Sequence, residues 1–571
     1  MNILKRGTTS LGLITGLGLL IAAAVMDLHG ESEAHAFIVQ GQDLASVRAA
    51  VLAAGGEVTH ELGVIRGVGA KLTSTEIENL RADGNFRIHR DAAVKTQAIE
   101  FYDYDIDYYI ENGLIPDSHY PALVKADRLH SYGVDGTGVT VAVLDTGASH
   151  SDSVLRDDQN ASDRILARYN AIRDKRGAVS DKNGHGTHVT SVIASNMRSS
   201  YTGAFHGVAP NVDLVLIKAF NKKGLGSYAD VIRGIDWVIG HQDTYNIRVL
   251  NLSFSATPQS YYWEDPLNQA VMAAWEAGIV VVASAGNNGP NPMTIGVPGN
   301  LPYVITVGAM TDSHTADRKR DDRLTTFSST GPTLERFVKP ELLAPGAHML
   351  GIMDPTQQTA TEHPDAQLLP DESLFVMSGT SQATAVISGV AALMLQADPS
   401  LSPDDVKCRL MASARFAVTA DGVPVYGAFQ QGAGLANALG ATRSEEEGCA
   451  NHGMDVSADL AGDRHYVGPA RLDAEGNFYI EGPEGTLYSG SFLWSDSFLW
   501  SDSFLWSDSF LWSDSFLWSD SFLWSDSFLW SDSFLWSDSF LWSDSFLWSD
   551  SFLWSDALIE TVGVNVWVPQ E

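Results

Sequence analysis

A serine at the start of a long apolar segment is the first residue of this sequence that could act as a nucleophile. Ser381 follows Gly379 and precedes the mostly apolar run 386–395, and the apolar positions of this stretch recur with a helical period. The first turn of a helix offers unpaired N–H groups and a partial positive charge, which stabilise negative charge that develops beside it. The pattern therefore fits either a nucleophile or a serine that merely caps the helix.

Three other segments contain residue types that would complete a serine-based site. Asp145 follows the apolar run 139–144, His185 lies between two glycines, and Asn287 lies on a Gly-rich turn after a second apolar run. Acyl transfer needs a carboxylate that orients an imidazole, an imidazole that takes the serine proton, and an N–H that faces the developing oxyanion. Together with Ser381, these residues favour the nucleophile over the cap.

Each segment alone also fits another chemistry. The Asp-Thr-Gly sequence at 145–147 occurs in aspartic proteases, but those need two such loops and this chain has one. His185 and His188 could bind a metal, but no Glu stands at the zinc-peptidase spacing, so His188 is expected to be structural. The Asn-Gly sequence at 288–289 would ordinarily be a turn. A Gly-x-Ser-x-Gly elbow is absent, and the order Asp, His, Ser is wrong for an α/β-hydrolase.

Strand-like and helix-like segments alternate around these residues. Helices are predicted at 228–239 and 265–277, and buried strands at 139–144, 213–217, 248–254, 279–283 and 303–307. This alternation predicts an α/β fold with a parallel sheet covered by helices on both faces. Because sites in such folds form at the carboxyl ends of the strands, Asp145 and Asn287 should lie at one edge of the sheet.

Length and charge limit the function classes. With 571 residues and 44% hydrophobic residues, the chain is too long for one ordinary domain. The formal net charge of −34 argues against nucleic acid or an acidic membrane surface as a partner. Cys408 and Cys449 are too few for a disulfide framework, and the sequence leaves open whether they pair.

The N-terminus has the features of a secretory signal peptide. Lys5 and Arg6 precede the apolar run 11–26, and Ala34-His35-Ala36 offers a cleavage site. The segment 1–36 is therefore predicted to direct export, which makes the protein secreted or cell-surface. Because the polar stretch before this site is long, an uncleaved anchor stays open.

The segment 37–95 is predicted to be a small α+β unit. It combines strand-like runs at 37–40, 64–72 and 86–90 with a helix at 44–53 and a short helix capped by Ser74. An independent binding domain is the alternative. The segment 96–120 has an acidic, aromatic stretch without a helical pattern, and is predicted to be a linker or an extended arm that lies on a neighbouring surface.

The C-terminal part is repetitive. Residues 441–490 are Gly-rich and acidic, and are predicted to be a linker with some strand content. Residues 491–556 are eleven copies of Ser-Phe-Leu-Trp-Ser-Asp. A period of six divides by two, so a stacked β-structure fits, and a disordered, sticky tail is the alternative. Residues 557–571 would form a closing strand.

Residues 121–440 resemble the subtilisin-like serine peptidases, or subtilases. Asp145-Thr146-Gly147, His185-Gly186-Thr187-His188, Ala285-Gly286-Asn287 and Gly379-Thr380-Ser381 match the four site motifs of the family, and Gly207-Val208-Ala209-Pro210, Asn251-Leu252-Ser253 and Ala344-Pro345-Gly346 match its structural motifs. The resemblance implies a serine endopeptidase (EC 3.4.21) in which Ser381 is the nucleophile, His185 the base and acid, and Asp145 its orienter. Asn287 and the Ser381 backbone N–H would form the oxyanion hole. The family's substrate-binding segments would correspond to Ser253, Phe254, Ser255, Ser284, Ala285 and Gly286.

The resemblance carries further expectations. The segment 37–95 resembles the family's inhibitory propeptide, which assists folding and is cut away, here within 92–120. Protein or peptide substrates and the protein's own propeptide are the expected partners. No cofactor is expected for the chemistry, whereas structural calcium is an expectation without a readable ligand set. The repeats could attach the enzyme to a cell surface or support assembly, and a non-catalytic member that binds through its tail is the rival hypothesis.

Three segments depart from the family pattern. Gln382 replaces the common Met after the nucleophile, and Ala385-Val386 replaces the usual Pro-His, so the start of the helix is expected to pack differently. Ser253-Phe254-Ser255 replaces the usual Ser-Leu-Gly beside the substrate groove, and Phe254 is expected to narrow that groove.

Overall fold

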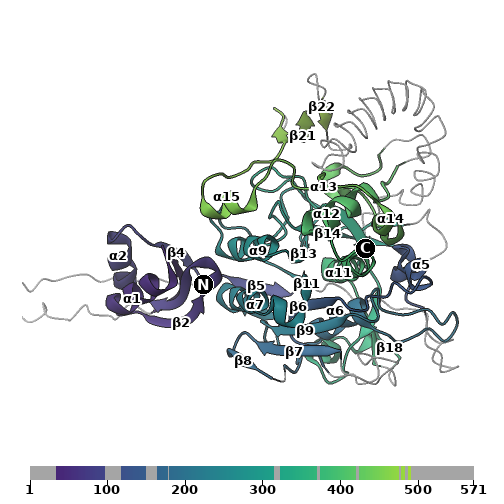
Figure 1. Ribbon diagram of the computed structural model, residues 1–571, viewed down its shortest axis with the longest axis horizontal. Coiled ribbons are helices and arrows are strands. Elements are labelled where there is room, and N and C mark those ends of the chain that lie inside the picture. Colours follow the sequence, from purple (N-terminus) through teal and green to yellow (C-terminus); the bar gives the residue numbers. More distant parts are fainter. Residues whose placement is uncertain are drawn as a thin grey trace, which may run out of the picture.

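A computed structural model of the chain consists of a small N-terminal unit beside a large α/β domain (Figure 1). It describes residues 34–96, 117–149, 164–177, 179–313, 322–369, 373–418, 424–474, 477–481 and 487–489. Nearly all of the expected signal peptide, most of the 96–120 linker, the repeats 491–556 and the expected closing strand 557–571 lie outside these residues. Among the described residues, no helix is long and apolar enough to cross a membrane.

The N-terminal unit folds around its own core. Its elements are β1 (His35–Gln40), α1 (Leu44–Ala54), β2 (Glu57–Leu62), β3 (Gly67–Leu72), α2 (Ser74–Ala82) and β4 (Arg87–Arg90). The strands form an antiparallel sheet in the order β2-β3-β1-β4, and the helices pack on it through Val47, Val51 and Leu80. This is the predicted α+β unit, with one correction. Thr73, not Ser74, caps α2, because its side chain accepts the N–H of Glu76 while the Glu76 carboxylate accepts the N–H of Thr73.

The large domain contains the predicted, mainly parallel sheet. In the described part of the chain the strand order is β15-β14-β13-β11-β6-β9-β7-β8, with β16 also paired to β14. The antiparallel strands β8 and β15 lie at its edges. The strands are β6 (Thr140–Asp145), β7 (Ile165–Asn170), β8 (Lys175–Arg176), β9 (Asp213–Lys218), β11 (Ile247–Leu252), β13 (Val280–Ser284), β14 (Ile305–Thr311), β15 (Arg323–Leu324) and β16 (Leu342–Pro345). The five predicted strands correspond to β6, β9, β11, β13 and β14.

One helix runs through the centre of this domain. In α11 (Thr380–Ala397) every residue from Thr380 to Leu395 is buried, and the helix packs against β11, β13, β14 and the helix α6 (His185–Ala194) (Figure 1). The predicted helices correspond to α7 (Tyr228–Gly240) and α9 (Pro266–Glu276). A helix buried on all sides is fixed in register by its neighbours, so the side chains of its first turn have defined positions.

The described residues between 441 and 481 are packed on the domain, contrary to the predicted linker. Cys408 lies in α12 (Pro403–Ala412), and Cys449 follows α14 (Ala438–Arg443). A disulfide joins these two cysteines, which answers the question that the sequence left open. Helix α15 (Val456–Ala461) then contributes Asp459, whose buried carboxylate accepts the hydroxyl hydrogens of Tyr262 and Tyr303 at 2.6 and 2.9 Å. The strands β20 (Ala470–Leu472), β21 (Phe478–Glu481) and β22 (Leu487–Ser489) follow.

Candidate active site

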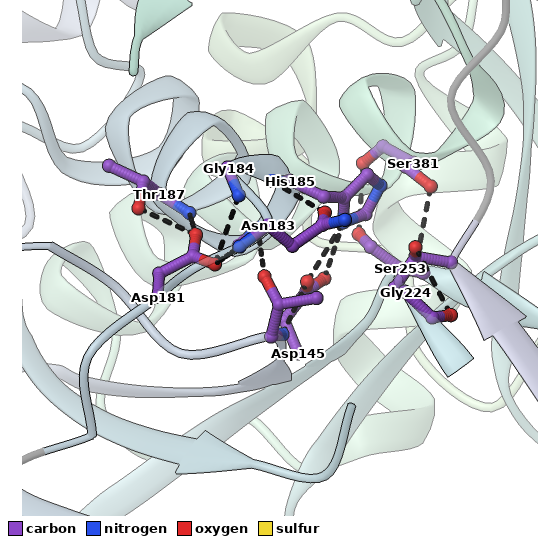
Figure 2. A network of polar contacts seen from close by, with 12 residues as sticks. Asp145, Asp181, Asn183, Gly184, His185, Thr187, Gly224, Ser253 and Ser381 are labelled. Carbon is purple, nitrogen blue, oxygen red and sulfur yellow. Dashed lines mark hydrogen bonds and ion pairs between the residues drawn. The ribbon is translucent and has the colours of Figure 1, made fainter. Parts of the chain in front are cut away.

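The ends of three elements bring Asp145, His185 and Ser381 together. Asp145 is the last residue of β6, His185 is the first residue of α6, and Ser381 lies in the first turn of α11. Nδ1 of His185 lies 2.8 Å from Oδ1 and 3.0 Å from Oδ2 of Asp145, and all three residues are buried. Figure 2 shows the imidazole between the Asp145 carboxylate and Ser381. The residues selected from the sequence therefore lie together, and hydrogen bonds join His185 to Asp145.

A second carboxylate holds the loop that presents His185. Oδ1 of Asp181 accepts the N–H groups of Asn183 and Gly184 at 2.8 and 3.0 Å, and Oδ2 accepts the N–H and hydroxyl of Thr187 at 2.9 and 2.7 Å (Figure 2). Asn183 in turn accepts the N–H of His185 at 3.1 Å. Sequence reasoning missed Asp181. The signal was an Asp placed shortly before a Gly and a helix start, where Asp side chains bind nearby backbone N–H groups.

The serine is tied to the chain that follows β11. Ser381 Oγ donates to the carbonyl of Ser253 at 3.0 Å, and Ser253 Oγ donates to the carbonyl of Ser381 at 2.9 Å (Figure 2). The side-chain amide of Asn251 donates to Ser253 Oγ at 2.9 Å. These reciprocal bonds fix the first turn of α11 against one wall of the site.

Asn287 is oriented by the residue that precedes the serine. Its Oδ1 accepts the N–H of Thr380 at 3.0 Å and the Thr380 hydroxyl at 2.8 Å. The N–H of Gly286, which has a φ of +109°, donates to the same hydroxyl at 3.3 Å. Because Thr380 holds the amide oxygen, the amide nitrogen must face the other way, where its N–H groups can serve an acceptor beside Ser381.

The expected substrate-binding residues line the same region. Ser284 Oγ donates to the Phe254 carbonyl at 2.8 Å, which joins the end of β13 to β12 (Phe254–Ser255). A Cβ atom at Gly286 would lie 3.3 Å from Ser255 Oγ, and the N–H of Gly296 donates to the Ala285 carbonyl at 3.1 Å. Ser253, Phe254, Ser255, Ser284, Ala285 and Gly286 are thus adjacent to one another.

The expectation that Phe254 narrows the groove stays a prediction. Its ring is fully buried and packs against the ring of Phe220, with a centroid distance of 5.1 Å. β5 pairs with Phe254 in this structure, so the ring is buried in a groove that already holds a peptide.

A strand from the N-terminal region lies beside these residues. β5 (Ala93–Thr96) is the middle strand of an antiparallel sheet, between β10 (Leu225–Ser227) and β12. Thr96 lies opposite Phe254, and its N–H donates to the Gly224 carbonyl at 3.0 Å. Val94 and Thr96 are buried, at 1% and 7% exposure, while the alternate residues Ala93 and Lys95 are exposed. The chain's own extended peptide therefore occupies a groove that leads to Ser253.

Burial lowers the pKa of two groups near Asp145 and His185. His188 is fully buried, which lowers its pKa to about 4, and its Nε2 contacts the carbonyls of Met349 and Phe375 at 3.1 and 3.3 Å. A neutral His188 that donates to the backbone fits the expected structural role. Lys218 donates to the carbonyl of Thr146, and burial lowers the pKa of Lys218.

No metal site is evident in the part of the chain that the structure describes. Those residues contain no group of three or more His, Cys, Asp or Glu side chains that could hold a metal ion. The expected calcium therefore stays a prediction, and no chemical step is assigned to it.

Comparisons with known proteins identify the family. The family model described as the subtilase family matches residues 136–463. The chain is 40% identical to serine protease AprX of Bacillus subtilis over 278 residues, a match that covers 48% of this chain and 60% of the length of AprX. It is 34% identical to subtilisin DY of Bacillus licheniformis over 294 residues, which covers 51% of this chain and 89% of that protein.

A solved structure resembles the overall fold. Fervidolysin from Fervidobacterium pennivorans, a keratinolytic enzyme related to subtilisin, superposes with a TM-score of 0.57 at 22% identity. The superposition covers 81% of this chain and 68% of fervidolysin, and at this identity it supports the fold alone. With the family match over more than half of its length, the chain belongs to the subtilase family.

Proposed function

We propose that this protein is a serine endopeptidase (EC 3.4.21) that hydrolyses peptide bonds of proteins through an acyl-enzyme. The observation that carries the proposal is the hydrogen bond of 2.8 Å between Asp145 and His185, with Ser381 on the other side of the imidazole (Figure 2). Subtilases are serine endopeptidases, which supports the reaction type. The chemistry needs no cofactor.

The proposed reaction assigns one task to each residue. Ser381 Oγ attacks the carbonyl carbon of the substrate, and His185 Nε2 takes its proton. Asp145 keeps the other ring nitrogen protonated and stabilises the imidazolium. His185 then gives the proton to the leaving amine, and water releases the acyl group by the same steps.

The oxyanion would be stabilised by two donors. The side-chain amide of Asn287 is one, because Thr380 holds its oxygen on the opposite side. The backbone N–H of Ser381, in the first turn of α11, is the other. Donors held in place before the reaction stabilise charge in the transition state without reorganisation.

The groove between β10 and β12 would bind substrate as an added strand. Main-chain bonds to both neighbours would hold an extended peptide, as they hold β5, and substrate side chains would contact residues 253–255 and 284–286. The alternation of buried Val94 and Thr96 with exposed Ala93 and Lys95 suggests that alternate substrate side chains are recognised.

The N-terminal unit would act as an inhibitory propeptide. β5 fills the groove, so a substrate cannot bind while this segment stays in place. Thr96, the last described residue of β5, lies opposite Phe254, and the neighbouring Ser253 has the carbonyl that accepts Ser381 Oγ. We therefore expect self-processing after Gln97, within the 92–120 range expected from the sequence.

The location and the tail complete the proposal. The leader 1–36 would export the enzyme, and the repeats 491–556 would attach it to a cell surface or support assembly. Deletion of 491–556 should move the enzyme from cells to medium. An unchanged distribution would contradict the attachment role.

Hydrolysis of an unfolded protein substrate by purified protein tests the activity. Ser381→Ala and Asp145→Asn should lower turnover by at least about 10³- to 10⁴-fold while circular dichroism stays unchanged. Turnover near the wild-type value in a folded Ser381→Ala variant would refute the assignment.

A further inference from the structure

The residue directly after the proposed nucleophile has a buried polar side chain with no partner. Gln382 is fully buried in the first turn of α11. Among the residues that the structure describes, neither Oε1 nor Nε2 of Gln382 has a hydrogen-bond partner. A side-chain amide has two donor hydrogens and an acceptor oxygen, and burial of such a group without partners destabilises a fold.

The other buried polar side chains in the first half of α11 have hydrogen-bond partners. Thr384 donates to the Thr380 carbonyl at 2.7 Å, and Ser388 donates to Oδ1 of Asn251 at 3.0 Å. Thr380 binds Asn287 through its hydroxyl. Gln382 is therefore an exception in an otherwise satisfied polar network, and such exceptions are expected where a group serves function.

The helical period places Gln382 across the nucleophile from the oxyanion donors. Successive residues of a helix are rotated by about 100°, so Thr380 and Gln382 lie on nearly opposite sides of α11 with Ser381 between them. Thr380 faces Asn287, whose amide is the proposed oxyanion donor. Gln382 is therefore on the other flank of Ser381, away from that donor.

We propose that the carboxamide of Gln382 positions the water molecule that attacks the acyl-enzyme. This inference rests on the proposed function, because it concerns the second half of that reaction. Oε1 accepts a hydrogen bond from the water, or Nε2 donates one to it, so the buried amide gains its partner at the step where it acts. Gln382 is a positioning residue and exchanges no proton.

The step balances without any further reactant. The water oxygen forms a bond to the acyl carbon, and His185 takes the water proton. The intermediate then breaks the bond between the acyl carbon and Ser381 Oγ, which receives the proton from His185. The products are a carboxylic acid and the free enzyme, and Gln382 ends in its starting state.

The test separates acylation from deacylation. A p-nitrophenyl ester releases nitrophenol in a burst that reports acylation, followed by a steady rate that reports deacylation. Gln382→Met keeps the volume and removes the amide. We expect it to slow deacylation about three- to tenfold, the loss of one hydrogen bond, with an unchanged burst rate. The ratio of hydrolysis to aminolysis by added glycinamide should fall by the same factor.

The same variant should slow deacylation but increase thermal stability. Because it removes an unpartnered buried amide, Gln382→Met should raise the Tm by about 2–6 °C. Thr306→Val is the matched control, since the buried Thr306 hydroxyl donates to the Gly299 carbonyl at 2.7 Å. It should lower the Tm and leave the ratio of acylation to deacylation unchanged.

Two results would overturn the Gln382 proposal and the proposed function separately. Equal deacylation rates and equal partition ratios in wild type and Gln382→Met would overturn the proposal, and Gln382→Leu serves the same comparison if the Met variant does not fold. Failure of the wild type to react with a fluorophosphonate would remove the proposed function itself, so the two failures are distinguishable.

Discussion

The two ends of the described chain are attached to the peptidase domain in different ways. The N-terminal unit has a separate core of its own, and it also packs Ile38, Leu62, Ile65 and Val94 against the core of the domain and forms hydrogen bonds such as Gln40 to Gln269 at 2.6 Å. The C-terminal segment instead contributes Tyr466, Ala470 and Ile480 to the core of the domain, and a disulfide holds it. The N-terminal unit can therefore keep a core of its own when it leaves, whereas the C-terminal segment is tied covalently to the domain.

The largest effect that tests this difference is expected on the free energy of unfolding when the disulfide is removed. The disulfide closes a loop over a sequence separation of 41 residues, so its loss should lower the free energy of unfolding by about 4 kcal/mol. We expect Cys408→Ala with Cys449→Ala to show this loss in urea unfolding of the processed enzyme. Inhibition by the N-terminal unit should not change. Equal unfolding free energies of the wild type and the double variant would mean that the disulfide-linked C-terminal segment does not stabilise the domain.

The next effect concerns the strand in the groove. Val94 is 1% exposed, so Val94→Asp would bury a carboxylate among apolar groups. The inhibition constant of a peptide comprising residues 34–96 against the processed enzyme should rise about 100-fold, or ~3 kcal/mol. Lys95→Ala, at an exposed position of the same strand, is the control and should change it less than about threefold. Equal effects of the two substitutions would argue against β5 as the inhibitory element.

A smaller loss of stability is expected when the buried carboxylate of the C-terminal segment, Asp459, is replaced. Asp459 accepts hydrogen bonds from Tyr262 and Tyr303, and its Oδ1 lies 2.7 Å from Nδ1 of His465. Asp459→Asn places an N–H group against donors and should cost about 2 kcal/mol in thermal unfolding. The exposed Asp463→Asn is the control. A domain as stable as wild type without this carboxylate would place the end of the core before residue 440.

The smallest effect is a pH dependence of the N-terminal attachment. Asp91 accepts the N–H of Ala229 at 3.1 Å, and burial raises the pKa of Asp91 above its ordinary value of 3.8. A pKa that is higher in the attached state favours attachment at low pH, and this contribution is lost as pH rises through the raised pKa. Inhibition by residues 34–96 should therefore weaken a few-fold as pH rises above 3.8, and Asp91→Asn should flatten that part of the profile. If the pH profile of inhibition is the same in Asp91→Asn as in the wild type, Asp91 is not the source of the pH dependence.

The sequence predicted the elements whose pattern is local. The strands of the parallel sheet are apolar runs, and α11 has a helical period, so the ends that carry Asp145, Asn287 and Ser381 could be placed. The loop before His185 could also be predicted, because glycines can be recognised in the sequence. The N-terminal unit could be predicted because its short strands and helices keep their own periodicity and its core is local.

Features that depend on distant contacts could not be predicted. Asp459 is a single carboxylate in an acidic stretch, and only the tyrosines from two other parts of the chain show that it is buried. The direction of the Phe254 ring depends on the register of β12 against β5. The missing partners of Gln382 are a property of its folded surroundings, which no local pattern contains.

Fluorophosphonate labelling of the secreted protein, with N-terminal sequencing of the labelled species, tests the central claim most directly. The wild type should be labelled and should begin at Ala98, whereas Ser381→Ala should remain unlabelled and keep residues 37–97. Absence of label on folded wild-type protein, or label on Ser381→Ala, would contradict an activated Ser381 in a self-processed enzyme.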